Sequence, residues 1–368
     1  DAEGVLPSYR GFHPHTLWSN YYAYIKEESL RACSIQEKQP FTDDPRNEFA
    51  SSGTYYFKSG ALMKKYFEKG VENKLMVNNE YYVSMVYQPM MDDGQKVYVY
   101  ELEHFMQWGT PSDLEEYIYW SDIFRGLLVE KSPPKQSGVL LLPMVGLGSR
   151  FQNEGYDTPK PLIPVSGLPM GVQALNDLPQ AESQRFVLRN EMQGLDQLKI
   201  ELKKTTIKSD FVLLDHMTDG QASTCEEGLM GMDRELPVTI AACDNGMLYN
   251  PDNFKELMQD ESIDIIVWGA KSYPGAIRSP NFYGWINADV KTNSIRNVSV
   301  KVPLDNPKSD PIIVGAFTFK RLGDFLDAVE RMKERKGLVN GEYYVDMAIN
   351  DAIALGKSCQ LFEVDKYI

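Results

Sequence analysis

The chain has 368 residues, of which 43% are hydrophobic and 24% are charged, as is typical of globular proteins. Its net charge of −14 argues against a general affinity for nucleic acid or for anionic membranes, because phosphate backbones attract clustered Lys and Arg side chains. No segment approaches the roughly 18 apolar residues of a membrane-spanning helix. Composition therefore predicts a soluble protein with one large or two medium domains.

The start of the chain and its cysteines bear on processing and compartment. The first residue is Asp1 rather than Met, with no basic-then-apolar leader after it, so we expect a piece of a longer protein or a processed form. The cysteines lie far apart without C-x-x-C spacing, at Cys33, Cys225, Cys243 and Cys359. This spacing predicts reduced thiols in a cytoplasmic protein rather than disulfides or a zinc site.

An internal repeat relates the beginning of the chain to its end at offsets of 261 to 263 residues (281 − 20 and 301 − 38). The period is far longer than the roughly 20–50 residues of solenoid repeats, so it predicts a duplicated domain. The matched segments are 20–25 with 281–286, 34–40 with 297–303, 53–58 with 315–320, 79–85 with 341–347, and 100–106 with 362–368.

The repeat predicts two unequal units. We expect residues 1–130 to be the C-terminal half of a first unit, and 138–368 to be a second unit without its extreme C-terminal segment. Apolar residues at helical spacing predict a helix over 113–128. Paired prolines and polar residues then predict a linker at 131–137.

The second unit alternates strand-like runs with helical stretches. The runs lie at 138–142, 210–214, 237–242 and 263–268. This alternation predicts an α/β fold, a Rossmann-like and mostly parallel sheet with helices on both faces.

The stretch 138–170 joins a strand to a glycine loop and two cations. Gly146 and Gly148 let the backbone pass close to a ligand, and Arg150 and Lys160 follow as positive charges. The pattern predicts a site for a polyphosphate. A dinucleotide-binding G-x-G-x-x-G motif is excluded because Phe151 occupies the place of its third glycine.

The two linked motifs, G-L-G-S-R at 146–150 and P-K-P-L-I-P-V at 159–165, resemble the signature of the sugar-1-phosphate nucleotidylyltransferase (NDP-sugar pyrophosphorylase) superfamily. The resemblance implies a nucleotide-diphospho-sugar transferase fold of the GT-A-like type. It also implies Mg²⁺-dependent transfer of NMP from an NTP to a sugar 1-phosphate or phospho-alcohol, with release of pyrophosphate. CTP or UTP and a capsule or surface-polysaccharide precursor are favoured, because the W-G-T-P form at 108–111 looks like those of capsule loci.

The same resemblance implies roles for individual residues. Arg150 and the loop amides would bind the β and γ phosphates, Lys160 the α phosphate, and Lys301 the acceptor phosphate. The implied nucleotide-binding residues are Met144, Gly146, Leu147, Gly148, Ser149, Gly220, Gln221, Ala222 and Asp244. Of these, Gly220 to Ala222 would hold the base, although T-D-G-Q could equally be the N-terminal cap of a helix. Lys301 could equally be an exposed lysine on a strand.

Two carboxylates are expected to hold the metal. Asp244 follows a predicted buried strand, where open α/β sheets place ligands, although D-N also begins many turns. Asp346 is the predicted second ligand, because Gln107 stands where many relatives have the Asp of W-x-D-x-G-T. Asp346 could instead be a charge at a helix N-terminus.

The chain departs from the family pattern at a few further positions. Val145 replaces the usual Gly or Ala and is expected to crowd the loop slightly, and Leu168 replaces a Lys. Val300 replaces the Glu of E-K-P, a motif that the first copy keeps as Glu37 and Lys38.

Two other functions remain open. One is a non-catalytic nucleotide-binding regulatory unit, which the degenerate first copy would suit. The other is a glycosyltransferase of similar topology, which would be expected to carry a well-placed D-x-D motif. The expected partners are an NTP and a small phosphorylated acceptor, and a homo-oligomer is compatible with the sequence.

Overall fold

The computed structural model describes residues 2–11, 13, 21–128, 133–205 and 208–368. Within these ranges, no helix combines the length and the apolar character that crossing a membrane requires. The chain divides into two compact units, Asp1–Ser121 and Asp122–Ile368, and the division falls inside helix α3 (Pro111–Leu127). Part of the predicted linker, 131–132, lies outside the described residues, whereas Lys135 already begins strand β9.

The second unit is built on a mixed sheet with the strand order β13-β12-β9-β14-β19-β16-β20. Neighbours from β13 to β14 run parallel, as do β16 and β20, and β19 runs antiparallel to both β14 and β16. The bounds are β9 (Lys135–Met144), β12 (Gln180–Arg189), β13 (Ser209–Leu214), β14 (Val238–Ala241), β16 (Ile265–Ala270), β19 (Ile312–Phe319) and β20 (Cys359–Glu363). The mostly parallel α/β sheet is confirmed, and the four predicted strands overlap β9, β13, β14 and β16.

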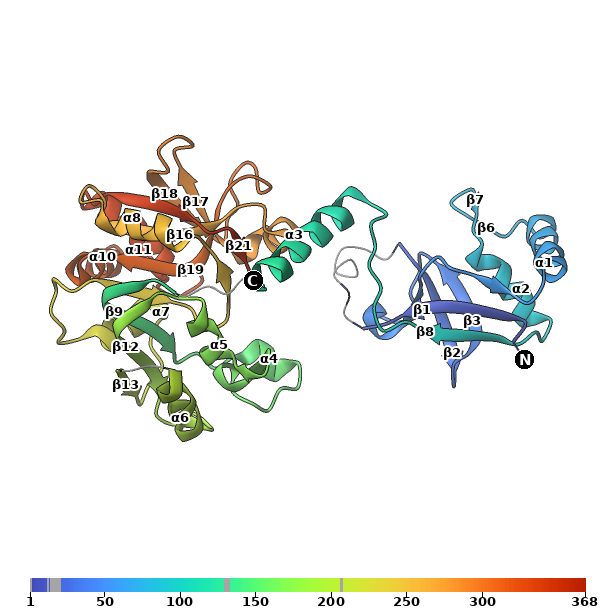
Figure 1. The fold of residues 1–368 in the computed structure, drawn as a ribbon, viewed down its shortest axis with the longest axis horizontal. Helices are drawn as coiled ribbons and strands as arrows, with labels where there is room; N and C mark the ends of the chain where they lie inside the picture. The colour runs from blue at the N-terminus through green and yellow to red at the C-terminus, as the bar shows by residue number, and fades with distance from the viewer. Residues whose placement is uncertain (1, 12, 14–20, 129–132, 206–207) are drawn as a thin grey trace. The chain divides into compact units, whose positions relative to one another are not determined.

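Helices cover both faces of this sheet because successive strand side chains point to opposite sides (Figure 1). Leu141 packs on one face with α7 (Gln221–Leu229), α10 (Leu322–Glu334) and α11 (Val345–Ala354). Leu140 and Leu142 pack on the other face. The helices there are α5 (Met170–Asn176), α6 (Leu195–Thr205) and α8 (Pro251–Gln259).

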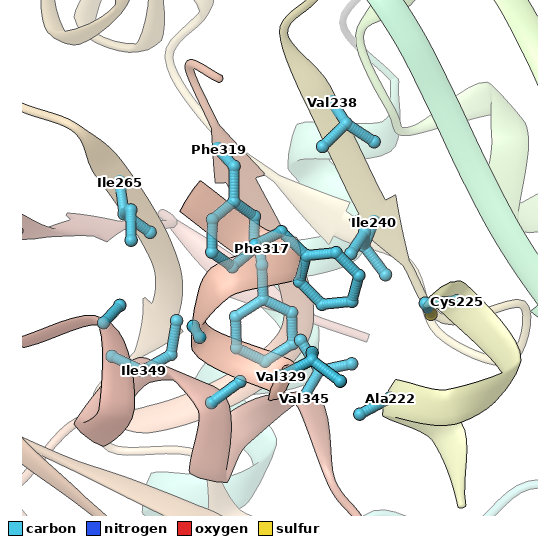
Figure 2. Close-up of a cluster of buried hydrophobic side chains, with 14 of the residues drawn as sticks. Ala222, Cys225, Val238, Ile240, Ile265, Phe317, Phe319, Val329, Val345 and Ile349 are labelled. Atoms are coloured by element: carbon cyan, nitrogen blue, oxygen red, sulfur yellow. The ribbon is translucent and has the colours of Figure 1, made fainter. Parts of the chain in front are cut away.

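The core under α7, α10 and α11 centres on two aromatic residues of β19. Phe317 and Phe319 are fully buried and lie among Ile240, Val329 and Ile349 (Figure 2). Truncating such a side chain typically costs about 3–5 kcal/mol, so this cluster contributes strongly to holding β19 between β14 and β16.

The remaining elements of the second unit are short. A hairpin of β17 (Gly284–Ala288) and β18 (Ile295–Val300) attaches to β19 through Trp285 and Ile312. The others are α4 (Ser149–Asn153), α9 (Pro274–Arg278), β10 (Pro164–Val165), β11 (Leu168–Pro169), β15 (Met247–Leu248) and β21 (Lys366–Tyr367).

The first unit is a six-stranded sheet with the order β4-β2-β3-β8-β1-β5, in which β4 also pairs with β1. Its core contains Leu6, Tyr66, Tyr87 and Met90, all with no exposed surface. The strands of this sheet are β1 (Gly4–Tyr9), β2 (Ala23–Glu28), β3 (Arg31–Glu37), β4 (Phe49–Ser51), β5 (Tyr56–Phe57) and β8 (Val97–Glu101). Strands β6 (Met76–Val77) and β7 (Glu80–Tyr81) pair with each other in a separate hairpin. The helices before α3 are α1 (Gly60–Glu72) and α2 (Tyr87–Asp92).

The strand pairings of the first unit recur in the second at the offsets of the sequence repeat. The parallel pair Gly4↔Val97 of β1 and β8 corresponds to Ile265↔Cys359 of β16 and β20. The antiparallel pair Tyr24↔Ala50 of β2 and β4 corresponds to Trp285↔Ile312 of β17 and β19. Residues related by the repeat therefore occupy equivalent places in the two units.

Candidate functional site

The strand order of the second unit has a topological switch point between β9 and β14. From β9 the chain moves outward to β12 and β13, and then returns to place β14 on the other side of β9. Open α/β sheets bind ligands at such a switch point, beyond the carboxyl ends of the strands. The glycine loop directly follows β9, and Asp244 lies just beyond the end of β14 at Ala241.

A cavity of about 260 Å³ opens at this point. Its lining contains four of the predicted nucleotide-binding residues and the two predicted phosphate-binding cations, Arg150 and Lys160, together with four neighbours. The lining residues are Pro143, Met144, Gly146, Gly148, Ser149, Arg150, Phe151, Lys160, Pro161 and Cys243. The structure thus brings the glycine loop and the P-K-P segment together around one space, with Leu147 exposed between the two glycines.

Gly148 is required at the turn into α4. Its φ of 66° lies in the left-handed region, and a Cβ atom there would lie 3.0 Å from Cβ of Lys160. At Gly146 the same position is open, so the backbone of the loop stays accessible. Val145 does not point into the loop, since it is buried in the core with Leu141 and Val187.

Lys160 and Asp244 form an ion pair although they are far apart in sequence. The Lys160 ammonium donates to Oδ2 of Asp244, and the side chains are 21% and 36% exposed. Arg150 is exposed and makes no hydrogen bond or ion pair with any residue that the structure describes. The edge of the cavity therefore offers one unpaired guanidinium and one cation that is held by a carboxylate.

Asp244 is suited to Mg²⁺. This ion is commonly held by one or two protein carboxylates while water and substrate phosphates complete its octahedron. The contact with the ammonium of Lys160, a residue that lines the cavity, shows that Asp244 can approach a cation. In the described part of the chain, no three His, Cys, Asp or Glu side chains gather into a metal cluster.

The loop predicted to hold the base is tied to the segment before α11. Tyr343 N donates to Asp219 O at 2.9 Å, and Ala222 N donates to Tyr343 O at 2.9 Å. A Cβ atom on Gly220 would lie 2.5 Å from the Tyr343 backbone, so this packing explains the glycine. Because Ala222 is fully buried, only Gln221 of the three predicted residues presents a polar side chain that is partly exposed.

Lys301 and Asp346 lie together in a second group of residues. Lys301 Nζ donates to Oη of Tyr344 at 2.8 Å and lies 4.9 Å from its ring centre. Burial raises the pKa of Asp346 to about 6, and the nearby Lys301 ammonium opposes this shift. Asp346 therefore accompanies Lys301, whereas Asp244 accompanies Lys160, and no described hydrogen bond or ion pair joins the two carboxylates.

Sequence reasoning missed Arg189. This residue ends β12, and its Nη1 donates to the Val145 carbonyl at 3.3 Å, so it braces the start of the glycine loop. The sequence signal that could have identified it is a positively charged residue at the end of a parallel strand. The strand itself was missed because only 186–188 of its ten residues are buried. The partner of Lys301, Tyr344, could not be assigned without the tertiary structure.

The four cysteines are all free, and three of them are buried. Burial raises the pKa of Cys243 to about 12, so this thiol beside Asp244 stays protonated at neutral pH.

No protein-family model matches the chain, and no curated protein sequence matches it. Among solved structures, a nucleoside-diphosphate-sugar pyrophosphorylase from Vibrio cholerae RC9 superposes with a TM-score of 0.51 and 20% identity, over 62% of this chain and 94% of that one. The inositol-1-phosphate CTP transferase from T. maritima gives 0.47 and 14%, over 62% and 85%. A UDP-glucose pyrophosphorylase bound to UDP-glucose gives 0.47 and 16%, over 62% and 92%.

The first of these comparisons shows the fold. At 62% of the chain, the matched region is larger than the first unit, which spans Asp1–Ser121, so the second unit must contribute. The predicted nucleotide-diphospho-sugar transferase fold is therefore confirmed.

Proposed function

We propose that the second unit is a nucleotidyltransferase that joins NMP from an NTP to a small phosphorylated acceptor and releases pyrophosphate. The observation that carries this proposal is that Arg150 and Lys160 line one cavity at the switch point of the sheet, where Lys160 is also paired with Asp244. The fold that this chain shares with a nucleoside-diphosphate-sugar pyrophosphorylase supports the same reaction class.

The glycine loop and its cations position the triphosphate. Arg150, which lacks a protein partner in the described structure, binds the β and γ phosphates together with the amides around Gly146 and Gly148. Lys160 leaves Asp244 and neutralises charge on the α phosphate. Gln221 can both donate to and accept from the base.

Asp244 is the residue that would hold Mg²⁺. When bound there, the ion would neutralise triphosphate charge and act as a Lewis acid toward a phosphoryl oxygen. The pairing with Lys160 shows that this carboxylate accepts a cationic partner.

Lys301 binds the acceptor. An oxygen of the acceptor phosphate attacks the α-phosphorus in line, the new P–O bond forms, and the bond to the β-phosphate oxygen breaks with pyrophosphate as the leaving group. No covalent intermediate with the protein is needed, since positioning and charge neutralisation supply the catalysis.

We further propose CTP or UTP as the nucleotide and a precursor of a capsule or surface polysaccharide as the product. The support is the family resemblance of the 138–170 stretch and of the W-G-T-P element. Thermal-shift measurements with each NTP and Mg²⁺ would rank the nucleotides.

A pyrophosphate-release assay tests the reaction. The full chain is incubated with Mg²⁺, each of the four NTPs, and a panel of sugar 1-phosphates and phospho-alcohols. Pyrophosphate formed in equal amount to the nucleotide product supports the proposal. Nucleotide binding without release under any combination would instead identify a regulatory nucleotide-binding unit, and release of an NDP from a nucleotide sugar would identify a glycosyltransferase.

A further inference from the structure

The environment of Lys301 is repeated around Lys38 in the first unit. Both lysines directly follow the second strand of a hairpin, and both adopt left-handed backbone, with φ of 58° and 60°. Such a conformation is uncommon for a residue with a side chain and is kept only where its surroundings impose it. The repeat therefore preserves a strained lysine at one place in each unit.

The contacts of the two lysines are also the same. Lys301 N donates to Tyr283 O at 3.0 Å, and Lys38 N donates to Tyr22 O at 2.8 Å. Each ammonium donates to a tyrosine hydroxyl, of Tyr344 at 2.8 Å in the second unit and of Tyr82 at 2.6 Å in the first.

The carboxylate beside each lysine comes from a different element in each unit. In the first unit, Glu37 precedes Lys38, and its Oε2 accepts a hydrogen bond from Ser84 Oγ at 2.5 Å. In the second unit, the residue before Lys301 is Val300, and the position of Ser84 is occupied by Asp346 at the start of α11. One carboxylate is thus kept in each unit, but it has moved from the strand to the helix.

A third position changes in step with these two. Glu37 pairs across the hairpin with Ala23, whereas Val300 pairs with Gly284. A Cβ atom on Gly284 would overlap Oδ2 of Asp346. The φ of Gly284 lies outside the left-handed region, so space rather than backbone conformation explains the glycine. The Ala-to-Gly change therefore makes room for the carboxylate in its new place.

We propose that Asp346 is the acceptor-specificity residue of the second unit, where its carboxylate accepts hydrogen bonds from hydroxyl groups of a polyhydroxylated phosphate such as a sugar phosphate. This inference rests on the proposed function and narrows its acceptor. The role of Asp346 as a metal ligand, predicted above, is the competing interpretation, and the Mg²⁺ dependence measured below distinguishes the two.

A hydroxylated acceptor fits this group better than a quaternary-ammonium phosphate. Recognition of a quaternary ammonium uses open aromatic faces. The ring of Tyr344 already lies against the Lys301 ammonium, at 4.9 Å from its centre to Nζ. Asp346 is partly exposed as a residue, and no other described side chain donates a hydrogen bond to its carboxylate, so the carboxylate keeps its capacity to accept from a hydroxyl.

The test uses the full chain and compares Asp346→Asn with Glu330→Gln, which removes an exposed carboxylate of α10. For the sugar 1-phosphate that gives most pyrophosphate, we expect Asp346→Asn to raise the acceptor KM about 10–100-fold. The KM of the NTP and the half-saturating Mg²⁺ concentration stay within about threefold, and Glu330→Gln matches the wild type. A tenfold rise in the Mg²⁺ requirement, or equal use of phosphocholine and sugar phosphate by the wild type, would overturn the inference.

Two further variants test the exchange between positions. Gly284→Ala keeps the acid but displaces it, so it should reproduce the acceptor defect with a normal circular-dichroism spectrum. Val300→Glu combined with Asp346→Ser rebuilds the arrangement of the first unit and should recover the acceptor KM relative to Asp346→Ser alone. If the double variant and the single variant Asp346→Ser have the same acceptor KM, the carboxylate has not been exchanged between positions 300 and 346.

If the wild type releases no pyrophosphate, the proposed reaction fails, but acceptor binding can still be measured. Isothermal titration of the full chain with glucose 1-phosphate and with inorganic phosphate then separates the two ideas. Binding of the sugar phosphate that Asp346→Asn weakens more than tenfold supports the acceptor site, and equal weakening for inorganic phosphate contradicts hydroxyl recognition.

Discussion

Two regions of the second unit hold their charges in different ways. At the glycine loop, Arg150 has no described partner, and Lys160 and Asp244 neutralise each other at an exposed edge. Around Lys301, the ammonium already donates to the Tyr344 hydroxyl, and the lysine backbone is held in a left-handed conformation. The ammonium is also near enough to Asp346 to oppose the rise in the pKa of that carboxyl. In the proposed reaction, the loop would have to release Lys160 from Asp244 to receive a triphosphate, whereas Lys301 is already held in place.

The largest effect is expected at the glycine loop. Lys160→Ala or Arg150→Ala removes a cation from the developing charge of the transition state and should lower kcat/KM by roughly 10²–10³-fold or more. Lys255→Ala, which removes an exposed lysine of α8, is the matched control and should keep normal turnover. Steady-state pyrophosphate release measures all three, and near-normal turnover of Lys160→Ala would remove the loop from the site.

A smaller and more selective effect is expected at Lys301. Lys301→Met keeps much of the length of the side chain but removes the ammonium, so the acceptor phosphate loses one charge-assisted contact. We expect about a 10²-fold loss of kcat/KM for the acceptor, with the NTP KM unchanged. Initial rates at varied acceptor and varied NTP measure the two constants, and an equal loss for both substrates would contradict a role confined to the acceptor.

Asp177 accepts a hydrogen bond from the segment that follows Asp244, and the effect of burying this carboxylate can be tested through pH. Asp177 accepts a hydrogen bond from Met247 N at 3.3 Å, and burial raises its pKa to about 6. The folded state therefore binds this proton more tightly than the unfolded state, so stability falls as pH rises from about 4 to about 6. Asp177→Asn, which keeps an acceptor for Met247, should increase the free energy of unfolding by roughly 1–3 kcal/mol at pH 8.

Urea unfolding of Asp177→Asn and wild type at pH 4 and pH 8 measures this difference. The stabilisation should be absent at pH 4, where the aspartic acid is neutral in the folded protein. An equal gain in the free energy of unfolding at both pH values would show that burying the ionised Asp177 carboxylate does not destabilise the folded state.

The smallest effect is expected from removing the hydroxyl that contacts Lys301. Tyr344→Phe keeps the ring against the Lys301 ammonium but removes its hydrogen-bond acceptor. Because a hydrogen bond to a charged group contributes about 1.5–3 kcal/mol and water can replace part of it, we expect a 3–10-fold rise in the acceptor KM. An effect as large as that of Lys301→Met would show that the tyrosine contacts substrate itself.

Local sequence was sufficient for much of the scaffold. The apolar run 138–142 lies within β9 as predicted, because a buried strand needs little beyond consecutive apolar residues. Gly148 was singled out as a position where the backbone can approach a ligand, and the structure adds that it adopts left-handed backbone before α4. By contrast, β12 was not predicted because the first part of the strand is polar, and the position of Arg189 at its end was therefore missed.

The sequence by itself determined the alternation of strands and helices, the glycine loop, the repeat and the residue types available for phosphate chemistry. Only the tertiary structure decided which of them meet: Lys160 with Asp244, Gly220 with the Tyr343 backbone, and Lys301 with Tyr344 and Asp346. The physical reason is that strand order and register bring distant residues together, and these depend on how all faces of the sheet are buried at once. The role proposed for Asp346 could be inferred only by comparing the structures of the two units. The comparison shows that its carboxylate takes the place of Glu37 and that Gly284 leaves room for it.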